Sequence, residues 1–339
     1  MWAASPAEAM IVMGVEGGAN MLTPRIPAKR EIRDWTTDSR HWERYKPRTG
    51  DIIIGTSAKC GTTWMQQVVC LLVFQSAEPR PITGLSPWLD ARAFIPIDEK
   101  FASIEAQSHR RFLKTHSQLD AVPFYDEVSY IHVGRYGLDA FMSWHHHSVI
   151  MTEGVLEAFD AAGIGDPAVG CPYPRPAQNA HDFFRTWMKD DEIARWGDSF
   201  PASRYFDIER SYWAERRAPN VLLVHYNDLK ADLESEMRRI ADFLNISIPA
   251  ATWPALIEAA TFASMKRNSA ELGPDWERAF VGGLDGFLAQ GTNARWRDVL
   301  TTEDVARFET RAGRELSPGL AQWLKSGRLA AGDPRGSTD

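Results

Sequence analysis

A short segment at residues 55–64 carries residue types that bind phosphate. Three isoleucines precede it, and it contains Lys59, Thr62 and Thr63. Backbone N–H groups at the start of a helix are unpaired and carry the positive end of the helix dipole, so an anion binds there readily. The lysine ammonium and the threonine hydroxyls would add side-chain donors. The segment predicts a strand, a phosphate-binding loop and a helix from Thr62 to about Phe74.

The position of the lysine distinguishes this loop from that of a nucleotide triphosphatase. In that loop the lysine directly follows the last glycine, in the order G-x-x-x-x-G-K-[ST]. Here Lys59 comes two residues before Gly61. The displaced lysine argues against a nucleotide kinase or ATPase, which would transfer a γ-phosphate with magnesium.

A second group of candidate catalytic residues ends a predicted strand. Residues 111–116 are apolar at first and finish with Lys114, Thr115 and His116. Side chains alternate along a strand, so Lys114 and His116 lie on one face and present a cation and a base together. An unperturbed imidazole titrates near neutral pH, which suits a general base. His116 is therefore the candidate base, with Lys114 beside it.

Four apolar segments are expected to form the sheet that positions these groups. Each ends where polar residues or glycine begin, and helical patterns separate them, which is typical of buried parallel strands. The predicted strands are residues 51–55, 111–116, 130–134 and 221–226. We expect an α/β fold, a single domain with a central parallel sheet flanked by helices.

Two regions outside these strands have distinct patterns. Apolar side chains recur every three or four residues across 231–244, which predicts an amphipathic helix, and Asn245 is a suitable C-terminal stop. Residues 153–219 are rich in glycine, proline and aromatic side chains and have irregular periodicity. We expect helices joined by long loops there, where segments that cover a substrate are often found.

Composition limits the class of protein. The chain of 339 residues has 38 Lys+Arg against 45 Asp+Glu, so its net charge of −7 argues against a nucleic-acid binder. The 3 cysteines lack metal-ligand spacing and fit a reducing, cytoplasmic compartment. No apolar run approaches the roughly 18–20 residues that a membrane span needs. Residues 1–25 are expected to be a poorly ordered extension, 26–329 the folded domain and 330–339 a flexible tail.

Residues 57–64 resemble the donor-binding loop of the cytosolic sulfotransferase family, which reads approximately Tyr-Pro-Lys-Ser-Gly-Thr-Thr-Trp. The chain keeps the lysine, the glycine, both threonines and the tryptophan. These enzymes move a sulfuryl group from 3′-phosphoadenosine 5′-phosphosulfate (PAPS) to a hydroxyl and release 3′-phosphoadenosine 5′-phosphate (PAP). The resemblance implies a P-loop-kinase-like sulfotransferase fold and donor contacts from Lys59, Cys60, Gly61, Thr62, Thr63 and Trp64.

Two further segments are similar to the same family. Residues 114–116 match its Lys-Thr-His segment, whose histidine deprotonates the acceptor. Residues 135–143 keep the arginine, aspartate and serine of Arg-Asn-Pro-Lys-Asp-x-x-x-Ser, but not its Asn, Pro and Lys. The resemblance implies that Arg135 and Ser143 bind the 3′-phosphate of the donor, and a guanidinium fork with a hydroxyl two helical turns later suits a phosphate monoester.

Two C-terminal segments complete the resemblance. Residues 287–297 are similar to Arg-Lys-Gly-x-x-Gly-x-Trp, but alanine and glutamine at 289–290 replace the Arg-Lys pair that grips the 3′-phosphate, so Arg295 or Arg297 would supply that charge. Residues 261–266 are similar to Ser-Phe-x-x-Met-Lys, whose phenylalanine stacks on adenine. A core role for the aromatic residues also remains open. The implied nucleotide contacts are Phe262, Met265, Gly291, Thr292 and Arg295.

The resemblance implies a PAPS-dependent sulfotransferase, similar to bacterial members, that acts on a small or lipid-like hydrophobic alcohol or phenol. His116 would be the general base, and Lys59 and Lys114 would stabilise the leaving phosphate oxygen, as cations do in phosphoryl transfer. We expect no metal, because the lysines can take its place. The acceptor pocket would be lined by aromatic residues, which could equally fill the core. They are Trp88, Phe94, Phe101, Phe124, Tyr125, Phe159, Tyr173, Phe183, Phe184 and Trp187.

Several alternatives remain open from the residues alone. The chain could be a P-loop nucleotide kinase or ATPase, or a non-catalytic module that holds adenosine bisphosphate. Histidines 145–147 suggest a metal, but consecutive helical residues point about 100° apart and cannot chelate together. Residues 297–306 occupy the place of the family's dimerisation segment without its Val and Glu, so both a monomer and a homodimer remain open.

Overall fold

A four-stranded parallel sheet lies at the centre of the fold. The structure is a computed structural model that describes residues 22–189, 201–288 and 291–339. Neighbouring strands are parallel, so their carboxyl ends meet at one edge of the sheet. This sheet confirms the predicted fold class and the four predicted strand segments. In the spatial order β2-β1-β3-β4, the strands are β1 (Ile52–Gly55), β2 (Phe112–Thr115), β3 (Ser129–Gly134) and β4 (Val221–His225).

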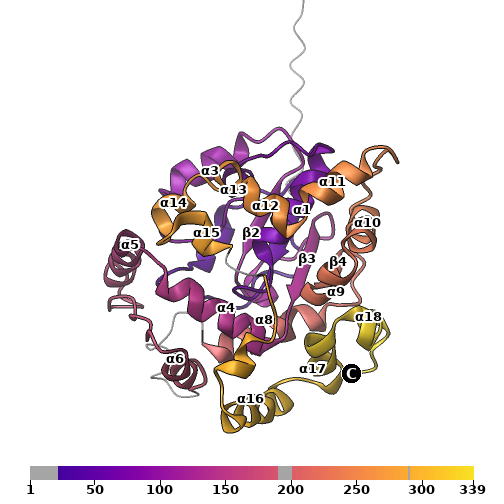
Figure 1. Ribbon diagram of the computed structural model, residues 1–339. Coiled ribbons are helices and arrows are strands. Elements are labelled where there is room, and N and C mark those ends of the chain that lie inside the picture. Colours follow the sequence, from indigo (N-terminus) through magenta and orange to yellow (C-terminus); the bar gives the residue numbers. More distant parts are fainter. Residues whose placement is uncertain (1–21, 190–200, 289–290) are drawn as a thin grey trace, which may run out of the picture.

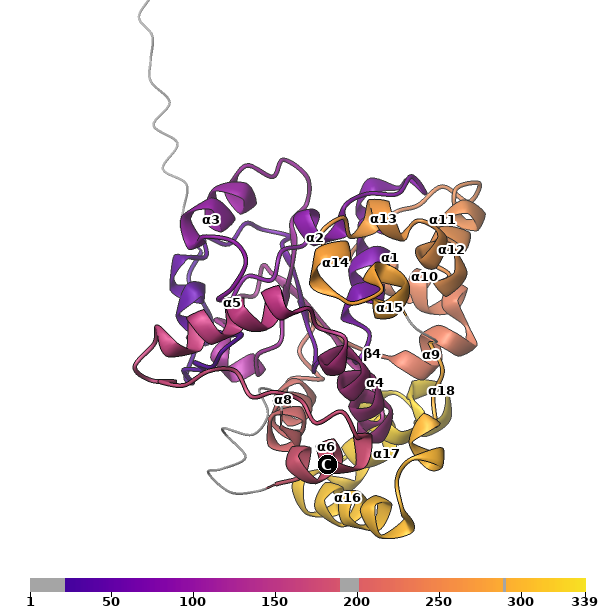
Figure 2. The same ribbon diagram turned by 60° about the vertical axis from the view of Figure 1, so that its left-hand side comes forward.

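Helices lie on both faces of the sheet (Figures 1 and 2), and each face has its own hydrophobic core. Ile52 and Ile54 belong to one core and Ile53 to the other, as alternation along a strand requires. The first core is covered by α1 (Thr62–Phe74), α10 (Leu233–Phe243), α11 (Trp253–Ala259) and α12 (Phe262–Arg267). The second is covered by α4 (Gly137–Val149), α5 (Glu153–Ile164), α6 (Ala180–Trp187), α8 (Ala202–Ala214), α16 (Thr302–Glu315) and α17 (Pro318–Ser326).

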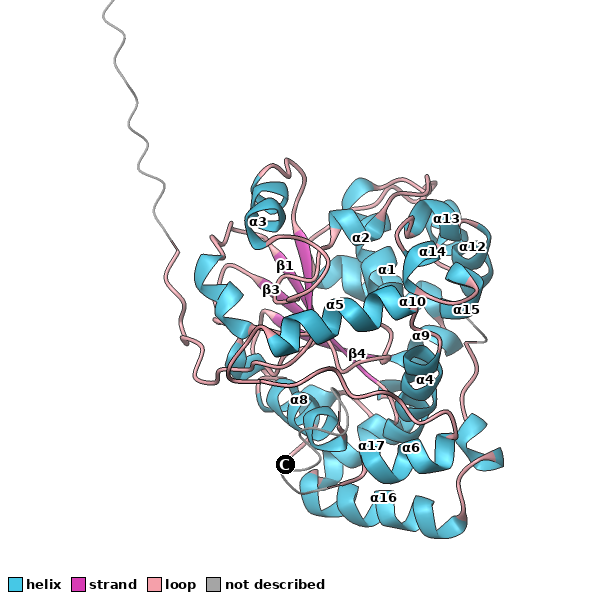
Figure 3. Cartoon of the chain, turned by 90° about the vertical axis from the view of Figure 1, so that its left-hand side faces the viewer, coloured by secondary structure: helices cyan, strands magenta, loops and turns pink. Residues whose placement is uncertain are grey.

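Short helices fill the connections between these elements, and loops join them (Figure 3). The short α-helices are α2 (Ile82–Leu85), α3 (Ile97–Glu105), α9 (Tyr226–Ala231), α13 (Ser269–Leu272), α14 (Trp276–Ala279), α15 (Gly283–Phe287) and α18 (Arg328–Ala331). The 3₁₀ helices are η1 (Ser39–Arg44), η2 (Leu119–Ala121), η3 (Arg295–Asp298) and η4 (Pro334–Gly336).

The predicted helices are present with one change of boundary. Helix α1 has the expected limits, whereas the segment 231–244 is divided because Asp232 caps a new helix. Its side chain accepts a hydrogen bond from the backbone N–H of Ser235, so α9 ends before it and α10 begins after it. Asn245 follows with a left-handed backbone (φ 53°), which suits a helix end.

The C-terminal residues differ from the expected flexible tail. The segment 330–339 contains the end of α18 and η4, and the guanidinium groups of Arg216 and Arg217 donate hydrogen bonds to the carbonyl oxygen of Ser337. These long-range bonds hold the tail, and composition alone did not reveal them. The expected N-terminal extension falls mostly on residues 1–21, outside the described part. Among the described residues, no helix combines the length and apolar character needed to cross a bilayer.

Candidate active site

The phosphate-binding loop joins β1 to α1 through two residues with left-handed backbones. Lys59 has φ 64° and Gly61 has φ 116°. A Cβ at Gly61 would lie 3.1 Å from the ring of Tyr226, so glycine fits this turn and larger residues do not. Gly61 is the N-cap of α1, and within the described residues no side chain caps this helix start. The first N–H groups of a 13-residue helix therefore face the loop without a side-chain acceptor, which fits an anionic ligand.

The side chains of the phosphate-binding loop do not all face the same side of the loop. The Thr62 hydroxyl lies 2.5 Å from that of Thr56, and Thr63 is half-buried. Cys60 is fully buried, with its sulfur 4.0 Å from a carboxylate oxygen of Glu209. The Cys60 side chain therefore faces away from the side of the loop where a sulfuryl donor is expected. Only the backbone of this residue could contact such a donor.

Lys59 is the half-buried cation of the loop. Its Nζ lies 3.4 Å from Nδ1 of His147 and 4.2 Å from the centre of the Phe287 ring. Burial, with the nearby positive charges of Arg135 and Lys114, lowers the pKa of Lys59 to about 7. An anion that binds beside Lys59 would raise this pKa and so favour the protonated, charged form of the lysine.

His116 lies just beyond β2, beside the loop. Its Nδ1 is 2.9 Å from the carbonyl oxygen of Thr56. A carbonyl only accepts hydrogen bonds, so Nδ1 carries the proton and Nε2 holds the lone pair of the neutral ring. Burial, followed by the charge of Lys114, lowers the pKa of His116 to about 3. The imidazole is therefore neutral and has the tautomer that a base acting through Nε2 requires.

The ring of Trp88 contacts both His116 and Lys114. Its ring meets His116 edge-on with centroids 4.9 Å apart, and the Nζ of Lys114 lies 5.3 Å from its centre. The indole N–H donates to the buried carboxylate of Asp90 at 2.7 Å, which fixes the ring. Burial lowers the pKa of Lys114 to about 8, against the attraction of Asp90. Both side chains thus contact one indole, as expected for residues on the same face of a strand.

A second basic group lies beside the loop, where a 3′-phosphate is expected. Arg135 is buried and donates to the carbonyl oxygen of Lys59 at 3.0 Å and to Oδ1 of Asn293 at 2.8 Å. The Nε atoms of Arg135 and of Arg295 in η3 are buried without a hydrogen-bond partner in the described part of the chain. An unpaired buried donor is costly, so both guanidinium groups fit an anion.

The structure distinguishes between the two candidate arginines of η3. Arg295 is half-buried, and burial together with the charge of Arg135 lowers its pKa, so these guanidinium groups lie near each other. Arg297 is exposed and lies over the ring of Trp296. Of the two arginines, Arg295 is therefore the one that lies beside Arg135. Ala289 and Gln290 lie outside the described residues.

The structure brings the residues that are expected to contact adenine only partly together. Trp64 donates through Nε1 to the carbonyl oxygen of Ala260 at 2.8 Å and meets the Tyr226 ring at 5.5 Å. Phe262 is half-buried and packs at the backbone of Gly291, where a Cβ would approach its ring to 3.2 Å. Met265 is buried in the core beneath α12, so it can support the base site only from behind.

Two other residues expected to contact the donor, Ser143 and Thr292, are less enclosed by the protein. Ser143 is half-buried on α4, two turns after Arg135, and Thr292 is exposed. The carboxylate of Asp139, one turn before Ser143, accepts a hydrogen bond from the backbone N–H of Ala294 at 2.5 Å. This bond connects α4 to the segment that carries Arg295.

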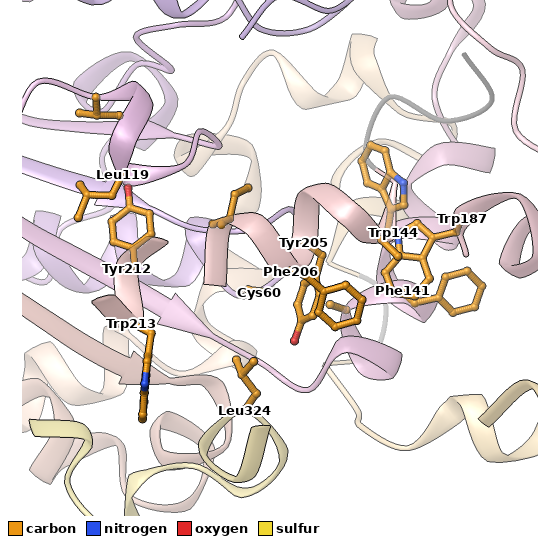
Figure 4. Packing of buried hydrophobic residues seen from close by; sticks show 14 of the residues in the cluster. Cys60, Leu119, Phe141, Trp144, Trp187, Tyr205, Phe206, Tyr212, Trp213 and Leu324 are labelled. Carbon is orange, nitrogen blue, oxygen red and sulfur yellow. The ribbon is translucent and has the colours of Figure 1, made fainter. Parts of the chain in front are cut away.

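Most of the aromatic residues expected around the acceptor belong to the core. Figure 4 shows Trp187 beside Phe141 and Trp144, and its ring also contacts that of Tyr205. A cavity beside the loop has a volume of about 10 Å³, room for no more than one water. Trp88 contacts the candidate base, and Phe94 is 59% exposed. The other eight expected residues are buried in the core: Phe101, Phe124, Tyr125, Phe159, Tyr173, Phe183, Phe184 and Trp187.

The three consecutive histidines face three different partners. His145 lies 3.2 Å from the carbonyl oxygen of Ala177, and His146 lies 2.9 Å from that of Gly286. His147 lies beside Lys59. No cluster of three His, Cys, Asp or Glu side chains within the described ranges is arranged to hold a metal ion.

Sequence reasoning missed two residues of the site, His147 and Glu209. Glu209 is buried on α8, accepts a hydrogen bond from the Ser57 hydroxyl at 2.7 Å and lies 2.8 Å from Nε2 of His132. Nδ1 of His132 lies 2.9 Å from the carbonyl oxygen of Gly55, so this pair holds the loop from behind. The sequence does contain a signal for His147, because this residue follows Ser143 by one helical turn and so lies on the same face of the helix. Glu209 had none.

Comparisons with known proteins agree with this architecture. The sulfotransferase domain family matches residues 49–318. A glycolipid sulfotransferase of Mycobacterium bovis is 32% identical over 308 residues, which cover 87% of this chain and 94% of that protein. A crystal structure of retinol dehydratase with androsterone and inactive cofactor PAP superposes with a TM-score of 0.62 at 20% identity, covering 83% and 87% of the two chains.

A second solved structure, mouse sulfotransferase SULT7A1 complexed with PAP, has a TM-score of 0.61 at 18% identity and covers 84% of this chain and 90% of that one. At such identities the likeness concerns the fold. The family match spans most of the chain, from just before β1 into the start of α17. The chain therefore belongs to the sulfotransferase family and is a sulfotransferase enzyme.

Proposed function

We propose that this enzyme transfers the sulfuryl group of PAPS to a hydroxyl of a small or lipid-like hydrophobic alcohol or phenol. The observation that carries the proposal is a group of three basic side chains at the carboxyl-end edge of β1 and β2: the half-buried Lys59 and Lys114 and the buried His116. The relatives named glycolipid sulfotransferases support a lipid-like acceptor. The neighbours solved with PAP support the donor.

The residues present fit this donor. The uncapped start of α1 and Lys59 would hold the phosphosulfate end, with Thr62 and Thr63 beside them. The unpaired Nε atoms of Arg135 and Arg295 would turn to the 3′-phosphate. That phosphate carries close to two negative charges at neutral pH. The remaining implied contacts are from Cys60, Gly61, Gly291 and Thr292 of the backbone turns, Ser143 of α4, and Trp64, Phe262 and Met265 near the base.

In the proposed reaction the acceptor oxygen attacks sulfur in line with the phosphate oxygen that leaves. His116 takes the hydroxyl proton on Nε2 as the new O–S bond forms, and the electrons of the broken S–O bond pass to the phosphate oxygen. Lys59 and Lys114 stabilise the charge that develops there. A pKa of about 3 makes His116 a weak base in the free enzyme. The negative charges of the bound donor would raise this pKa, because they offset the neighbouring lysines.

The proposal is tested by mixing the purified enzyme with radiolabelled PAPS and a panel of phenols, long-chain alcohols and glycolipids. We expect transfer to at least one acceptor and a loss of roughly 10²–10⁴-fold in His116→Ala, the usual contribution of a general base. PAP binding without turnover of any acceptor would indicate a non-catalytic module. Magnesium-dependent transfer of a γ-phosphate would indicate a kinase.

The proposal also places the enzyme in the cytoplasm, as a monomer or a homodimer. The three cysteines are free, and Cys60 and Cys70 are buried, which fits a reducing compartment. Sedimentation of the purified enzyme would distinguish the two oligomeric states.

A further inference from the structure

Residues from three other parts of the chain hold Lys59 in place. Its carbonyl oxygen accepts the hydrogen bond from Arg135, and its Nζ lies 3.4 Å from Nδ1 of His147 and 4.2 Å from the centre of the Phe287 ring. His147 belongs to the last turns of α4, and Phe287 ends α15. Two segments about 140 residues apart therefore meet at one amine.

The surroundings of His147 keep its imidazole neutral. The ring stacks on Trp144 with centroids 5.4 Å apart and contacts Phe280 at 4.8 Å and Phe287 at 5.7 Å. Burial lowers the pKa of His147 well below its ordinary value, and four basic groups act in the same direction. They are Lys59 of the loop, Lys114 of β2, His116 beyond β2 and His146 of α4.

The direction of the hydrogen bond follows from these charges. An ammonium group has only donors, whereas a neutral imidazole has one nitrogen with a lone pair. Lys59 therefore donates and Nδ1 of His147 accepts, which places the imidazole proton on Nε2. The Phe287 ring meets the ammonium from another side as a cation–π partner.

We propose that His147 is a positioning residue for Lys59: its Nδ1 holds the lysine ammonium where the leaving oxygen of the sulfuryl donor arrives. This inference rests on the proposed function. A lysine side chain has four rotatable carbons and a strongly hydrated charge, so a half-buried lysine without an acceptor loses both its direction and part of its protonation. His147 lies one turn beyond Ser143 on the same face of α4, so this helix would serve both ends of the donor.

Three variants separate the acceptor nitrogen from the packing of the ring. His147→Phe keeps an aromatic ring between Trp144 and Phe280 but removes the acceptor. His147→Asn restores an acceptor near the place of Nδ1. His145→Phe is the matched control, because His145 lies two residues away on the same helix and faces the carbonyl oxygens of Ala177 and Gln178.

The measurement is kcat/KM for PAPS between pH 5.5 and 9 at a fixed acceptor concentration. This parameter reports the pKa values of the free enzyme. In His147→Phe we expect about a tenfold loss at pH 7.5, the usual worth of a hydrogen bond to a charged group. We also expect the limb that falls with rising pH to move about one pH unit lower, because the ammonium has lost its acceptor. His147→Asn should recover most of both effects, and His145→Phe should match the unaltered enzyme.

Two results would overturn the inference. One is a His147→Phe enzyme with unaltered kcat/KM and pH limb. The other is a loss that is equal at every pH and is not recovered by His147→Asn, which would assign His147 to packing alone. If the unaltered enzyme transfers no sulfuryl group but binds PAP, the proposed function fails separately. Calorimetric PAP binding by the same variants then tests the contact, with a drop of about tenfold in affinity in His147→Phe supporting it and equal affinity overturning it.

Discussion

Binding of PAP should take up about one proton per enzyme molecule at pH 7.5, because two half-buried lysines are partly neutral in the free enzyme. The pKa of Lys59 is lowered to about 7 and that of Lys114 to about 8, both chiefly by burial. At pH 7.5 about three quarters of Lys59 and about one quarter of Lys114 are then neutral. A nucleotide anion beside both amines raises both pKa values, so both amines become protonated in the complex.

The sign of the pH dependence follows from the same values. Protonated lysine is the form that binds the anion, so affinity for PAP falls as pH rises. Between pH 7 and 8 the affinity should fall about fivefold from Lys59 alone, and above pH 8 Lys114 should add a second factor. The 3′-phosphate itself ionises near pH 6 and contributes little above pH 7.5.

Isothermal titration calorimetry in two buffers of different ionisation enthalpy measures the proton uptake directly. At pH 7.5 we expect about one proton for the unaltered enzyme, about a quarter in Lys59→Met and less than about three quarters in Lys114→Met, because each substitution removes one amine and loss of the Lys114 charge also raises the pKa of Lys59. The two variants control for each other, since both replace a lysine by an uncharged chain of similar length. Uptake near zero from pH 7 to 9 would refute the reasoning, as would an uptake that neither substitution changes.

Two further predictions concern residues around the loop. Arg295→Ala should weaken PAP binding about tenfold or more, because a charge-assisted bond is lost, whereas Arg297→Ala, at an exposed site, should leave the dissociation constant within about twofold. Equal effects of the two substitutions would contradict the assignment. Glu209→Ala should lower the free energy of unfolding by roughly 3 kcal/mol in urea titrations, since it leaves the buried Ser57 hydroxyl and His132 ring without their acceptor, whereas Glu215→Ala, at the end of the same helix, should change it little.

The parts of the fold that were predictable from the sequence are those with a local cause. The strands β1 to β4 are short apolar runs, and α1 follows a loop of small residues, so periodicity and composition were enough. The position of Lys114 and His116 on one face followed from alternation along β2. Asp232 was the exception within a regular pattern, because its side chain caps α10 and divides the predicted helix.

The parts that were not predictable depend on contacts between distant segments. Arg295 and Arg297 are equivalent in sequence, and only the packing of η3 against α4, with the Asp139 bond to Ala294, turns one of them inward. The tail at 330–339 has the composition of a loose end but is held by two arginines of the segment after α8. Local patterns do not contain such pairings.

The back of the phosphate-binding loop departs from the family pattern at two positions while the turn itself is kept. Ser57 and Cys60 stand where the family has Tyr and Ser, and both side chains point to the carboxylate of Glu209. The positions that are kept, Lys59 and Gly61, have the two left-handed backbones, and the threonines begin α1. Substitution on the buried side of the loop is therefore compatible with the same anion site, provided that Glu209 and His132 hold the backbone in place. The two substituted side chains, Ser57 and Cys60, therefore contact the support of the loop, whereas the retained residues form its turn and the start of α1.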